Sequence, residues 1–399
     1  SSLTGNMVST SYYFAQLPAW VERFNSARHA DALMGRQWTR LLPDETEYLK
    51  RAGVDAPAWE KSAKDTDADV SFPHAITKAQ SGEIYAPLDV SPFSNDLLLD
   101  FAEQALVNEG LGEDVDTDIL TLSFSANDYV GHRYGPYSQE TMDITLRTDR
   151  QIASLLDFVN QRVGLQNVIV VFSADHGVAP VPEQAAALKL DGARISNRQV
   201  LETVRAEIRR RYARPGAPDD ATADYVLNLS NGNLYFNREA LRRDRINSEE
   251  LERVAGEAAL QVPGINRYFT RSQLQRAEIL PTDQIARRAL HGFNTRRSGD
   301  VILVTDPFKY LDTAIQATHG SPYSYDTHVP LIIMGPGITA GRYHQAATPA
   351  DIAPTLALLL RVQAPSNSTG RVLVEALSVA ARARRSEERL MNLSVNLSK

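Results

Sequence analysis

The sequence of 399 residues contains no cysteine. Disulfide bonds and thiolate metal ligands are therefore excluded, and any zinc ion must be held by histidine and carboxylate side chains. The sequence has no apolar run of about 18 residues, the length that a helix needs to span a bilayer, and we expect no signal peptide before Ser1. Because it also lacks an initiating methionine, we expect a processed product or a fragment.

Basic residues are not in excess either. The sequence holds 42 Lys and Arg against 49 Asp and Glu, which gives a net charge of −7. This balance argues against non-specific binding of nucleic acid. What is present is ordinary for a globular protein, with 43% hydrophobic and 23% charged residues. A chain of this length can form one large core with an inserted subdomain, or two domains.

Two apolar runs predict strands buried on both faces of a parallel sheet. Residues 168–172 form an unbroken β-branched and aromatic run, and residues 119–124 form a second apolar run. A helix that starts near Ser138 connects them, and the order strand, long helix, strand is typical of a doubly wound α/β sheet. The strand pattern resumes at residues 300–304 and 329–334.

Residues 183–294 interrupt this pattern, and we expect them to form an inserted α+β cap. Two charged helices are predicted at residues 197–212 and 248–261. Between them, Asn231 and Gly232 separate two apolar runs, and this dipeptide favours the type I′ turn of a β-hairpin. The arginine clusters of the cap are expected to be solvated helix faces, with a role facing the substrate as the alternative; they are Arg209, Arg210 and Arg211, and Arg242 and Arg243.

Potential metal ligands occur in three separate segments, each just after a predicted strand or in a loop beside one. These are Asp128 with His132, Asp175 with His176, and His319. Open α/β sheets bind ligands beyond the carboxyl ends of their strands, and zinc accepts imidazole and carboxylate. The alternative for Asp175 and His176 taken alone is a loop with a solvated Asp and a packed His.

Several motifs resemble those of the alkaline phosphatase superfamily, in particular the bacterial phosphate-irrepressible alkaline phosphatases and the related nucleotide pyrophosphatase/phosphodiesterases. The resemblance rests on residues 123–132 with Tyr134, Gly135, Pro136 and Glu140; on 174–177; on 318–323 with Asp326, His328, 329–331 and 335–338; and on 351–356. It extends from about Ser9 to Leu377. It implies an α/β three-layer sandwich with a mostly parallel central sheet and the inserted cap. Residues 1–399 would then be a catalytic domain without its first strand and nucleophile helix.

The resemblance also implies a set of zinc ligands. Asp128, His132 and His319 would hold one Zn²⁺, and Asp175 and His176 would hold a second. In the family, the second ion also takes an Asp of the first strand and the nucleophilic Thr or Ser, and neither can be matched in this sequence. One of the two zinc sites is therefore expected to be complete and the other to lack two ligands.

For other residues near these motifs, the sequence leaves two possible roles open. Tyr129 and Arg133, beside ligands, either line a substrate cleft or have no part in the site. Asp326 either orients His319 or caps a turn.

Four further histidines are expected to lack partners and to be structural or exposed: His29, His74, His291 and His344. His328 is expected to be packed or hydrogen-bonded rather than a metal ligand. Thr4, Ser9 and Thr10 are not candidates for the nucleophile. We expect the acidic residues 65–69 to form a solvated loop rather than a calcium site, and the tail after Ala380 to form a solvated helix.

The resemblance implies zinc-dependent hydrolysis of phosphate monoesters, or of diesters, through a covalent phospho-Thr or phospho-Ser intermediate. The alternatives are a sister activity of the superfamily (phosphodiesterase, sulfatase or metal-dependent mutase) and a non-catalytic metal-binding fragment. The expected partner is a small phosphate ester, with no nucleic acid and no membrane span, and the sequence indicates no oligomeric state. The resemblance further implies a bacterial periplasmic or secreted protein.

Overall fold

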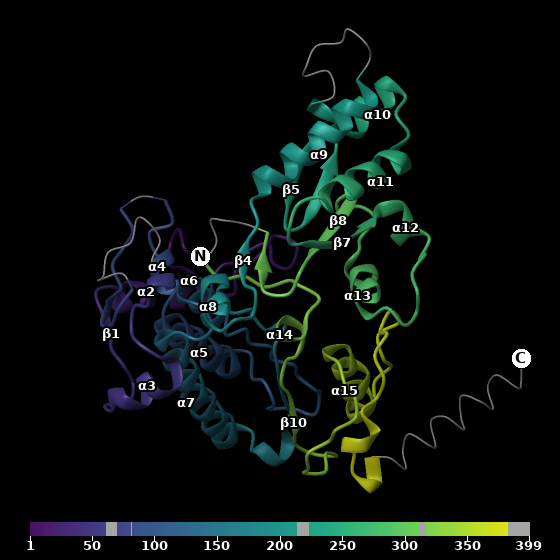
Figure 1. The fold of residues 1–399 in the computed structure, drawn as a ribbon. Coiled ribbons are helices and arrows are strands. Elements are labelled where there is room, and N and C mark those ends of the chain that lie inside the picture. The colour runs from purple at the N-terminus through teal and green to yellow at the C-terminus, as the bar shows by residue number, and fades with distance from the viewer. Residues whose placement is uncertain (61–69, 81, 214–222, 312–315, 382–399) are drawn as a thin grey trace, which may run out of the picture.

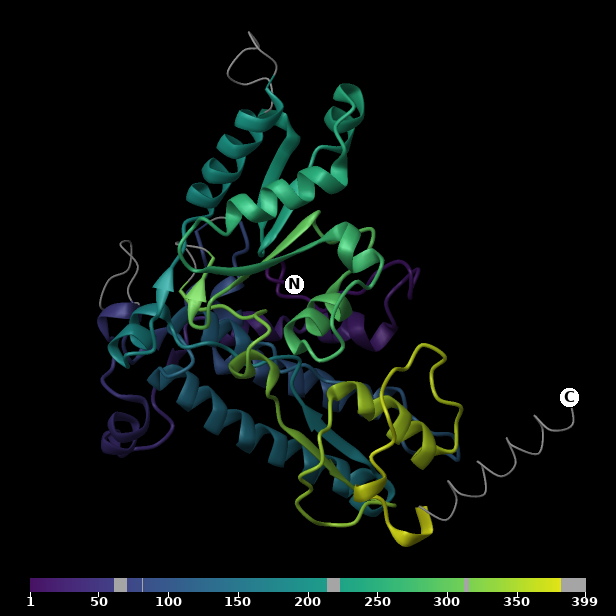
Figure 2. The ribbon, with the colours of Figure 1, turned by 45° about the vertical axis from the view of Figure 1, so that its right-hand side comes forward.

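The computed structural model describes residues 1–60, 70–80, 82–213, 223–311 and 316–381. The acidic residues 65–69 and most of the tail after Ala380 lie outside the described residues. Figures 1 and 2 show two lobes, a lower core and an upper α/β cap. No helix within the described ranges is both long enough and apolar enough to cross a membrane.

Helices dominate the N-terminal part of the core. Its elements are α1 (Ala19–Ser26), α2 (His29–Leu33), β1 (Gln37–Trp38), α3 (Glu45–Ala52), β2 (His74–Ala75), α4 (Ala86–Asp89), α5 (Pro92–Asn108), α6 (Ala126–Tyr134) and α7 (Gln139–Arg162). Ser138 caps α7 by accepting a hydrogen bond from the backbone N–H of Thr141. Buried Trp38, Val130 and Ile144 belong to one apolar cluster that joins β1, α6 and α7. This cluster therefore fixes α6 in the core.

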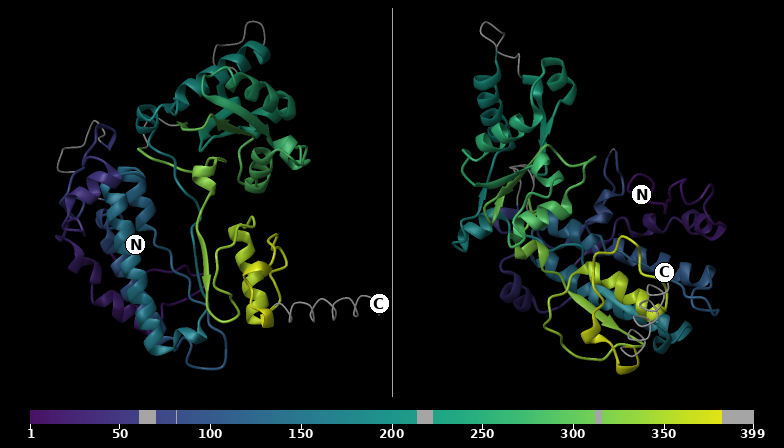
Figure 3. Two further views of the ribbon diagram at one scale, coloured as in Figure 1. Left: turned by 60° about the horizontal axis from the view of Figure 1, so that its bottom comes forward. Right: turned by 90° about the vertical axis from the view of Figure 1, so that its right-hand side faces the viewer.

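A two-stranded ribbon lies beside these helices. β3 (Val170–Ser173) pairs antiparallel with β10 (Leu331–Met334), with Leu331 opposite Ser173. Figure 3 (left) shows the N-terminal helices on one side of β10 and α15 (Ile352–Leu360) on the other. The core is thus layered as helices, strands and helix.

The expectation that residues 168–172 are buried on both faces is wrong. Phe172 is 40% exposed, and the other residues of β3 are half-buried. Residues 119–124 form no strand, and Ile119 is 73% exposed. The physical reason is a lack of neighbours: β10 is the single described strand that pairs with β3, and no described strand pairs with residues 119–124.

The cap and its junction with the core occupy the middle of the chain. The elements are α8 (Pro182–Ala187), β4 (Ala193–Arg194), α9 (Asn197–Tyr212), β5 (Val226–Ser230), β6 (Asn233–Phe236), α10 (Arg238–Asp244), α11 (Ser248–Ala259), β7 (Ile265–Thr270), α12 (Arg271–Gln275), α13 (Gln284–Gly292), β8 (Val301–Thr305), β9 (Lys309–Tyr310) and α14 (Ser324–Thr327). The cap sheet has the strand order β5-β6-β8-β7. β8 was expected in the central sheet, but it pairs with β6 and β7, so this expectation is wrong.

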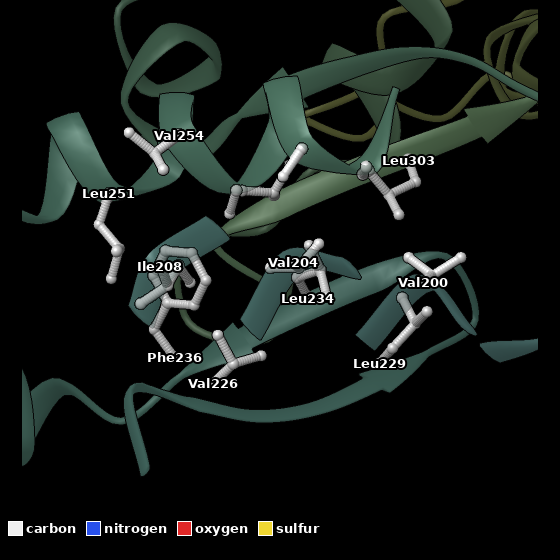
Figure 4. Close-up of a cluster of buried hydrophobic side chains, with 14 of the residues drawn as sticks. Val200, Val204, Ile208, Val226, Leu229, Leu234, Phe236, Leu251, Val254 and Leu303 are labelled. Carbon is white, nitrogen blue, oxygen red and sulfur yellow. The ribbon is translucent and has the colours of Figure 1, made fainter. Parts of the chain in front are cut away.

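The hydrophobic core of the cap forms between its sheet and two helices. Val200, Val204 and Ile208 recur every four residues on α9 and are fully buried (Figure 4). Burying each such side chain stabilises the fold by about 1.5–3 kcal/mol. The expected hairpin turn is confirmed, because Asn231 and Gly232 have φ angles of 46° and 71°, which a type I′ turn requires.

The chain enters and leaves the cap through a short parallel pair. β4 pairs with β9, so that Arg194 lies opposite Tyr310. The junction therefore pairs a strand that precedes the cap sheet with a strand that follows it.

Candidate metal centre

Helix α6 presents the first two potential ligands. Asp128 lies in its first turn, where a carboxylate complements the helix dipole. His132 follows one turn later, so both side chains lie on one face of the helix. His132 Nε2 lies 3.4 Å from Asp128 Oδ2.

His176 comes from the loop that follows β3. Its neighbour Gly177 donates a backbone hydrogen bond to the carbonyl of Asp326 over 2.7 Å. A Cβ atom on Gly177 would lie 2.2 Å from the carbonyl oxygen of Tyr325, so a larger residue cannot fit without displacing that backbone. The absence of a side chain at residue 177 therefore brings the loop after β3 against the segment around α14.

His319 joins these groups from the segment that precedes β10. Its Nε2 lies 3.6 Å from Asp128 Oδ1 and 3.2 Å from His132 Nε2. His176 Nε2 lies 4.0 Å from the same Asp128 oxygen. Four of the expected ligands are thereby brought together from three distant segments.

The geometry fits a divalent cation. Among the described residues, Asp128, His176 and His319 offer ligand atoms that all lie within 4.8 Å of one another, a spacing from which these atoms could hold a metal ion. Two ligand atoms on a tetrahedral zinc ion are roughly 3.4 Å apart, so the observed separations need to close only slightly.

The outward nitrogens of two imidazoles are also anchored as metal-binding histidines require. His132 Nδ1 donates to the carbonyl of Ala317 over 2.7 Å, and His176 Nδ1 donates to the carbonyl of Gly177 over 2.9 Å. Such contacts fix the ring and leave Nε2 facing the ion. In both rings Nε2 faces Asp128.

The electrostatics favour the metal-binding forms of Asp128 and His319. The hydrogen bond from His132 holds the pKa of Asp128 below its ordinary value, although burial opposes this. The same contact raises the pKa of His132. Burial, followed by the neighbouring His176, lowers the pKa of His319. At neutral pH Asp128 is thus an ionised carboxylate and His319 a neutral imidazole, which are the forms that bind metal, whereas His132 must lose a proton when metal binds.

Asp175 lies at the edge of the cluster. Its side chain is 89% exposed, and Oδ2 lies 3.6 Å from His176 Nε2. Oδ1 accepts a hydrogen bond from the backbone N–H of His176. Asp175 is therefore next to the cluster but is more open to solvent than the other candidate ligands.

The remaining candidates are placed as follows. Tyr129 is 49% exposed on α6. Arg133 lies over the ring of Tyr134, 5.4 Å from its centroid. Asp326 caps a turn, because its Oδ2 accepts a hydrogen bond from the backbone N–H of Ser321 over 2.7 Å.

Two buried acids near α6 were missed by sequence reasoning. His74 was expected to have no partner, but its Nε2 lies 2.8 Å from Glu140 Oε1, and both side chains are buried. Glu60 is also buried, and burial raises its pKa to about 9, helped by the negative charges of Glu140 and Asp55. Glu140 was noted only as part of a motif, and nothing in the sequence near Glu60 marks it as buried.

Comparisons with known proteins identify the family of the chain. Residues 11–328 match the family described as type I phosphodiesterase / nucleotide pyrophosphatase. The chain is 30% identical over 378 residues to a protein of Myroides odoratus named calcium-transporting ATPase, a match that covers 94% of this chain and 67% of that protein. It is 29% identical to the alkaline phosphatase PafA of Elizabethkingia meningoseptica, with coverages of 94% and 66%.

A solved structure is similar as well. The crystal structure of wild-type alkaline phosphatase PafA matches with a TM-score of 0.80 and 28% sequence identity, over 94% of this chain and 69% of that chain. The expected α/β fold of the alkaline phosphatase type is thereby confirmed. The chain spans about two thirds of the length of the curated relatives that it matches most fully.

Proposed function

The chain belongs to the type I phosphodiesterase / nucleotide pyrophosphatase family, and from this premise we propose that it binds zinc and hydrolyses phosphate esters. The prediction of a hydrolase of the alkaline phosphatase/phosphodiesterase type is confirmed at the level of the family. The metal, its ligands and the reaction of this chain are the content of the proposal.

One observation carries the proposal. Asp128 Oδ1 lies 3.6 Å from His319 Nε2 and 4.0 Å from His176 Nε2, although the three residues come from separate segments. Packing alone does not require two imidazoles to converge on one carboxylate oxygen. Two neighbouring cations, with the Asp128 carboxylate beside both, account for the arrangement.

We assign the ligands as the family resemblance implies. Asp128, His132 and His319 hold one zinc ion, and Asp175 and His176 contribute to a second. A bound zinc ion acts as a Lewis acid on phosphoryl oxygen and neutralises charge that develops during phosphoryl transfer. Asp128 supplies negative charge between the two proposed zinc sites. The backbone carbonyls of Ala317 and Gly177 orient the rings of His132 and His176.

The proposed nucleophile is a Thr or Ser hydroxyl that forms a covalent phosphoryl intermediate. In the part of the chain that the structure describes, no Ser or Thr hydroxyl is hydrogen-bonded to the side chains of the cluster. This step therefore rests on the family resemblance. We assign no residue of the sequence to it.

The substrate we propose is a small phosphate monoester, with diesters as the next candidate. Tyr129 and Arg133, next to ligands on α6, are proposed to line the substrate side of the centre. Because the named alkaline phosphatase relatives are bacterial, we further propose a periplasmic or secreted location. A sulfatase and a non-hydrolytic zinc protein are the outcomes that the test below separates, and a metal-dependent mutase would fall in the second class.

The test combines zinc content with turnover. The full chain is dialysed against zinc, its bound metal is measured by mass spectrometry, and hydrolysis of p-nitrophenyl phosphate, its bis ester and p-nitrophenyl sulfate is followed. We expect at least one zinc per chain and preference for the monoester. Asp128→Asn and His319→Ala should lose bound zinc and turnover. His344→Ala, at an exposed histidine, should retain bound zinc and turnover. Retention of zinc by the first two variants would refute the ligand assignment, and zinc without turnover would favour a non-catalytic protein.

A further inference from the structure

Arg194 makes a bidentate ion pair at the junction between core and cap. It lies in β4, where the chain enters the cap. Its Nε and Nη2 donate to the two carboxylate oxygens of Glu183 over 2.6 and 3.0 Å. Only 17% of the Arg194 side chain is exposed. Two parallel hydrogen bonds of this kind fix the guanidinium in one orientation.

The same guanidinium holds the segment that leads to His319. Nη2 of Arg194 also donates to the carbonyl of Gln316 over 3.1 Å. The next residue, Ala317, is fully buried, and its carbonyl accepts the hydrogen bond from His132 Nδ1. Its backbone N–H in turn donates to the carbonyl of His132 over 3.3 Å. One peptide unit therefore separates the contact with Arg194 from the contact that orients a proposed ligand.

Tyr310 holds the loop that follows His176. Tyr310 is buried in β9, opposite Arg194. Its hydroxyl donates to the carbonyl of Ala179 over 2.9 Å and lies 3.2 Å from that of Pro180. The Arg194 guanidinium lies 5.8 Å from the centre of its ring. The loop after β3 and the segment before β10 are thus tied to the same pair of short strands.

We propose that Glu183, Arg194 and Tyr310, here called the junction clamp, position the metal ligands. The clamp holds the Ala317 carbonyl against His132 and the segment of His319 beside it, and it fixes the loop that carries His176. The metal centre is thereby coupled to the point where the cap joins the core. This inference rests on the proposed zinc binding, but it concerns residues that do not touch the metal.

Loss of a group that orients a ligand typically lowers metal affinity by about 10–100-fold. Arg194→Met keeps most of the apolar stem and removes every hydrogen bond of the guanidinium. Arg194→Lys keeps the charge but cannot form the bidentate contact. Arg253→Met is a matched control, because Arg253 pairs with Glu257 on the exposed face of α11, in the cap.

The test measures binding of Co²⁺ to the full chain by competition with a chelating dye, together with the visible absorption spectrum of the bound Co²⁺. We expect Arg194→Met to weaken binding about tenfold or more and to change the spectrum. Arg194→Lys should recover part of the affinity, and Arg253→Met should match the unsubstituted chain in both readouts. Because the spectrum reports ligand geometry, a general loss of stability would not shift it in the molecules that remain folded.

Three outcomes would overturn the inference. Wild-type affinity and spectrum in Arg194→Met would remove the positioning role while leaving the proposed function intact. If Arg194→Met does not fold, Tyr310→Phe, which removes a single hydroxyl, must alter the spectrum, and an unchanged spectrum would contradict the clamp. Failure of the unsubstituted chain to bind Co²⁺ would refute the proposed function and the inference together.

Discussion

The imidazole rings of His176 and His319 are stacked, with centroids 3.4 Å apart and ring planes inclined by 13°. Two positive charges at about 4 Å repel each other by roughly 4 kcal/mol in a partly buried site, so at least one ring of the stack is neutral. This agrees with the lowered pKa of His319, which has burial as its main cause. The stack therefore belongs to the protonation state that can accept a cation.

Gly177 allows this stack to form, and its substitution is our first prediction. In Gly177→Ala the new methyl group would lie 2.2 Å from the carbonyl oxygen of Tyr325, so the loop that carries His176 must move. We expect zinc affinity, measured by chelator competition, to fall about tenfold or more.

Gly131→Ala is the matched control for this prediction. Gly131 lies in α6 between Asp128 and His132, and a Cβ atom there would meet nothing within 4 Å. Because alanine stabilises a helix interior by about 0.5–1 kcal/mol over glycine, this variant should bind zinc normally and be no less stable. Equal zinc affinity in the two variants would contradict our account of the loop.

Glu60 gives a prediction about pH. Burial raises the pKa of Glu60 from 4.5 to about 9, with Glu140 and Asp55 acting in the same direction and Arg133 opposing them. Between these two pKa values the unfolded chain has lost a proton that the folded chain retains. The contribution of Glu60 to the free energy of unfolding is therefore greatest at low pH. It falls as the pH rises from 4.5 to about 9, by on the order of 1 kcal/mol per pH unit.

Glu60→Gln removes this titration, because the amide is neutral at every pH. Urea unfolding at about pH 5 and 8 should show the variant gaining stability over the unsubstituted chain at the higher pH. Glu22→Gln, at an exposed residue of α1, should leave the pH dependence unchanged. Parallel stability curves for the Glu60 variant and the unsubstituted chain would show that Glu60 is ionised when folded.

The buried pair of His74 and Glu140 lies beside the C-terminal end of α6, where the Tyr134 hydroxyl is 3.5 Å from His74 Nδ1. His74→Leu would leave the Glu140 carboxylate buried without its partner, and we expect a loss of about 3–5 kcal/mol in unfolding free energy. Replacing both residues by leucine should cost less than the two single changes combined, since no unpaired group remains. Because burial raises the pKa of Glu140, a loss below about 1 kcal/mol in the single variant would indicate that Glu140 is buried as the neutral acid.

Local features of the fold were predictable from sequence. The helix at Asn197–Tyr212 and the turn at Asn231 and Gly232 follow from patterns within a few residues, and both are confirmed. Asp128 and His132 could be placed on one helical face because their spacing is a single turn. The motifs that resemble the alkaline phosphatase superfamily indicated the fold class, which the structural match confirms.

Pairings between distant segments were not predictable. The run at residues 300–304 predicts a strand, but its composition does not say whether β6 or β3 is its neighbour. The contact between His74 and Glu140 spans 66 residues and leaves no local signal. The junction clamp was missed for the same reason, since Arg194 and Gln316 meet only through the parallel pairing of β4 with β9.

The ribbon of β3 and β10 has an exposed apolar face, and this leads to a prediction about association. Ile332 is 58% exposed and lies opposite Phe172, and Met334 lies on the same face. Such faces and unpaired strand edges promote contact between molecules. Ile332→Lys should therefore reduce self-association measured by light scattering.

Val115→Lys provides the comparison, because Val115 is an isolated, exposed apolar residue outside the ribbon. It adds the same charge without altering the ribbon, so its association should match that of the unsubstituted chain. An equal reduction by both variants would attribute the effect to net charge rather than to the ribbon.

The central claim is that Asp128, His132, His176 and His319 surround bound metal. Anomalous diffraction at the zinc edge from crystals of the zinc-loaded chain tests it most directly. Our account predicts an anomalous peak about 2.0–2.2 Å from a carboxylate oxygen of Asp128 and from Nε2 of His319. A zinc peak elsewhere on the chain, with these side chains left without metal, would contradict it.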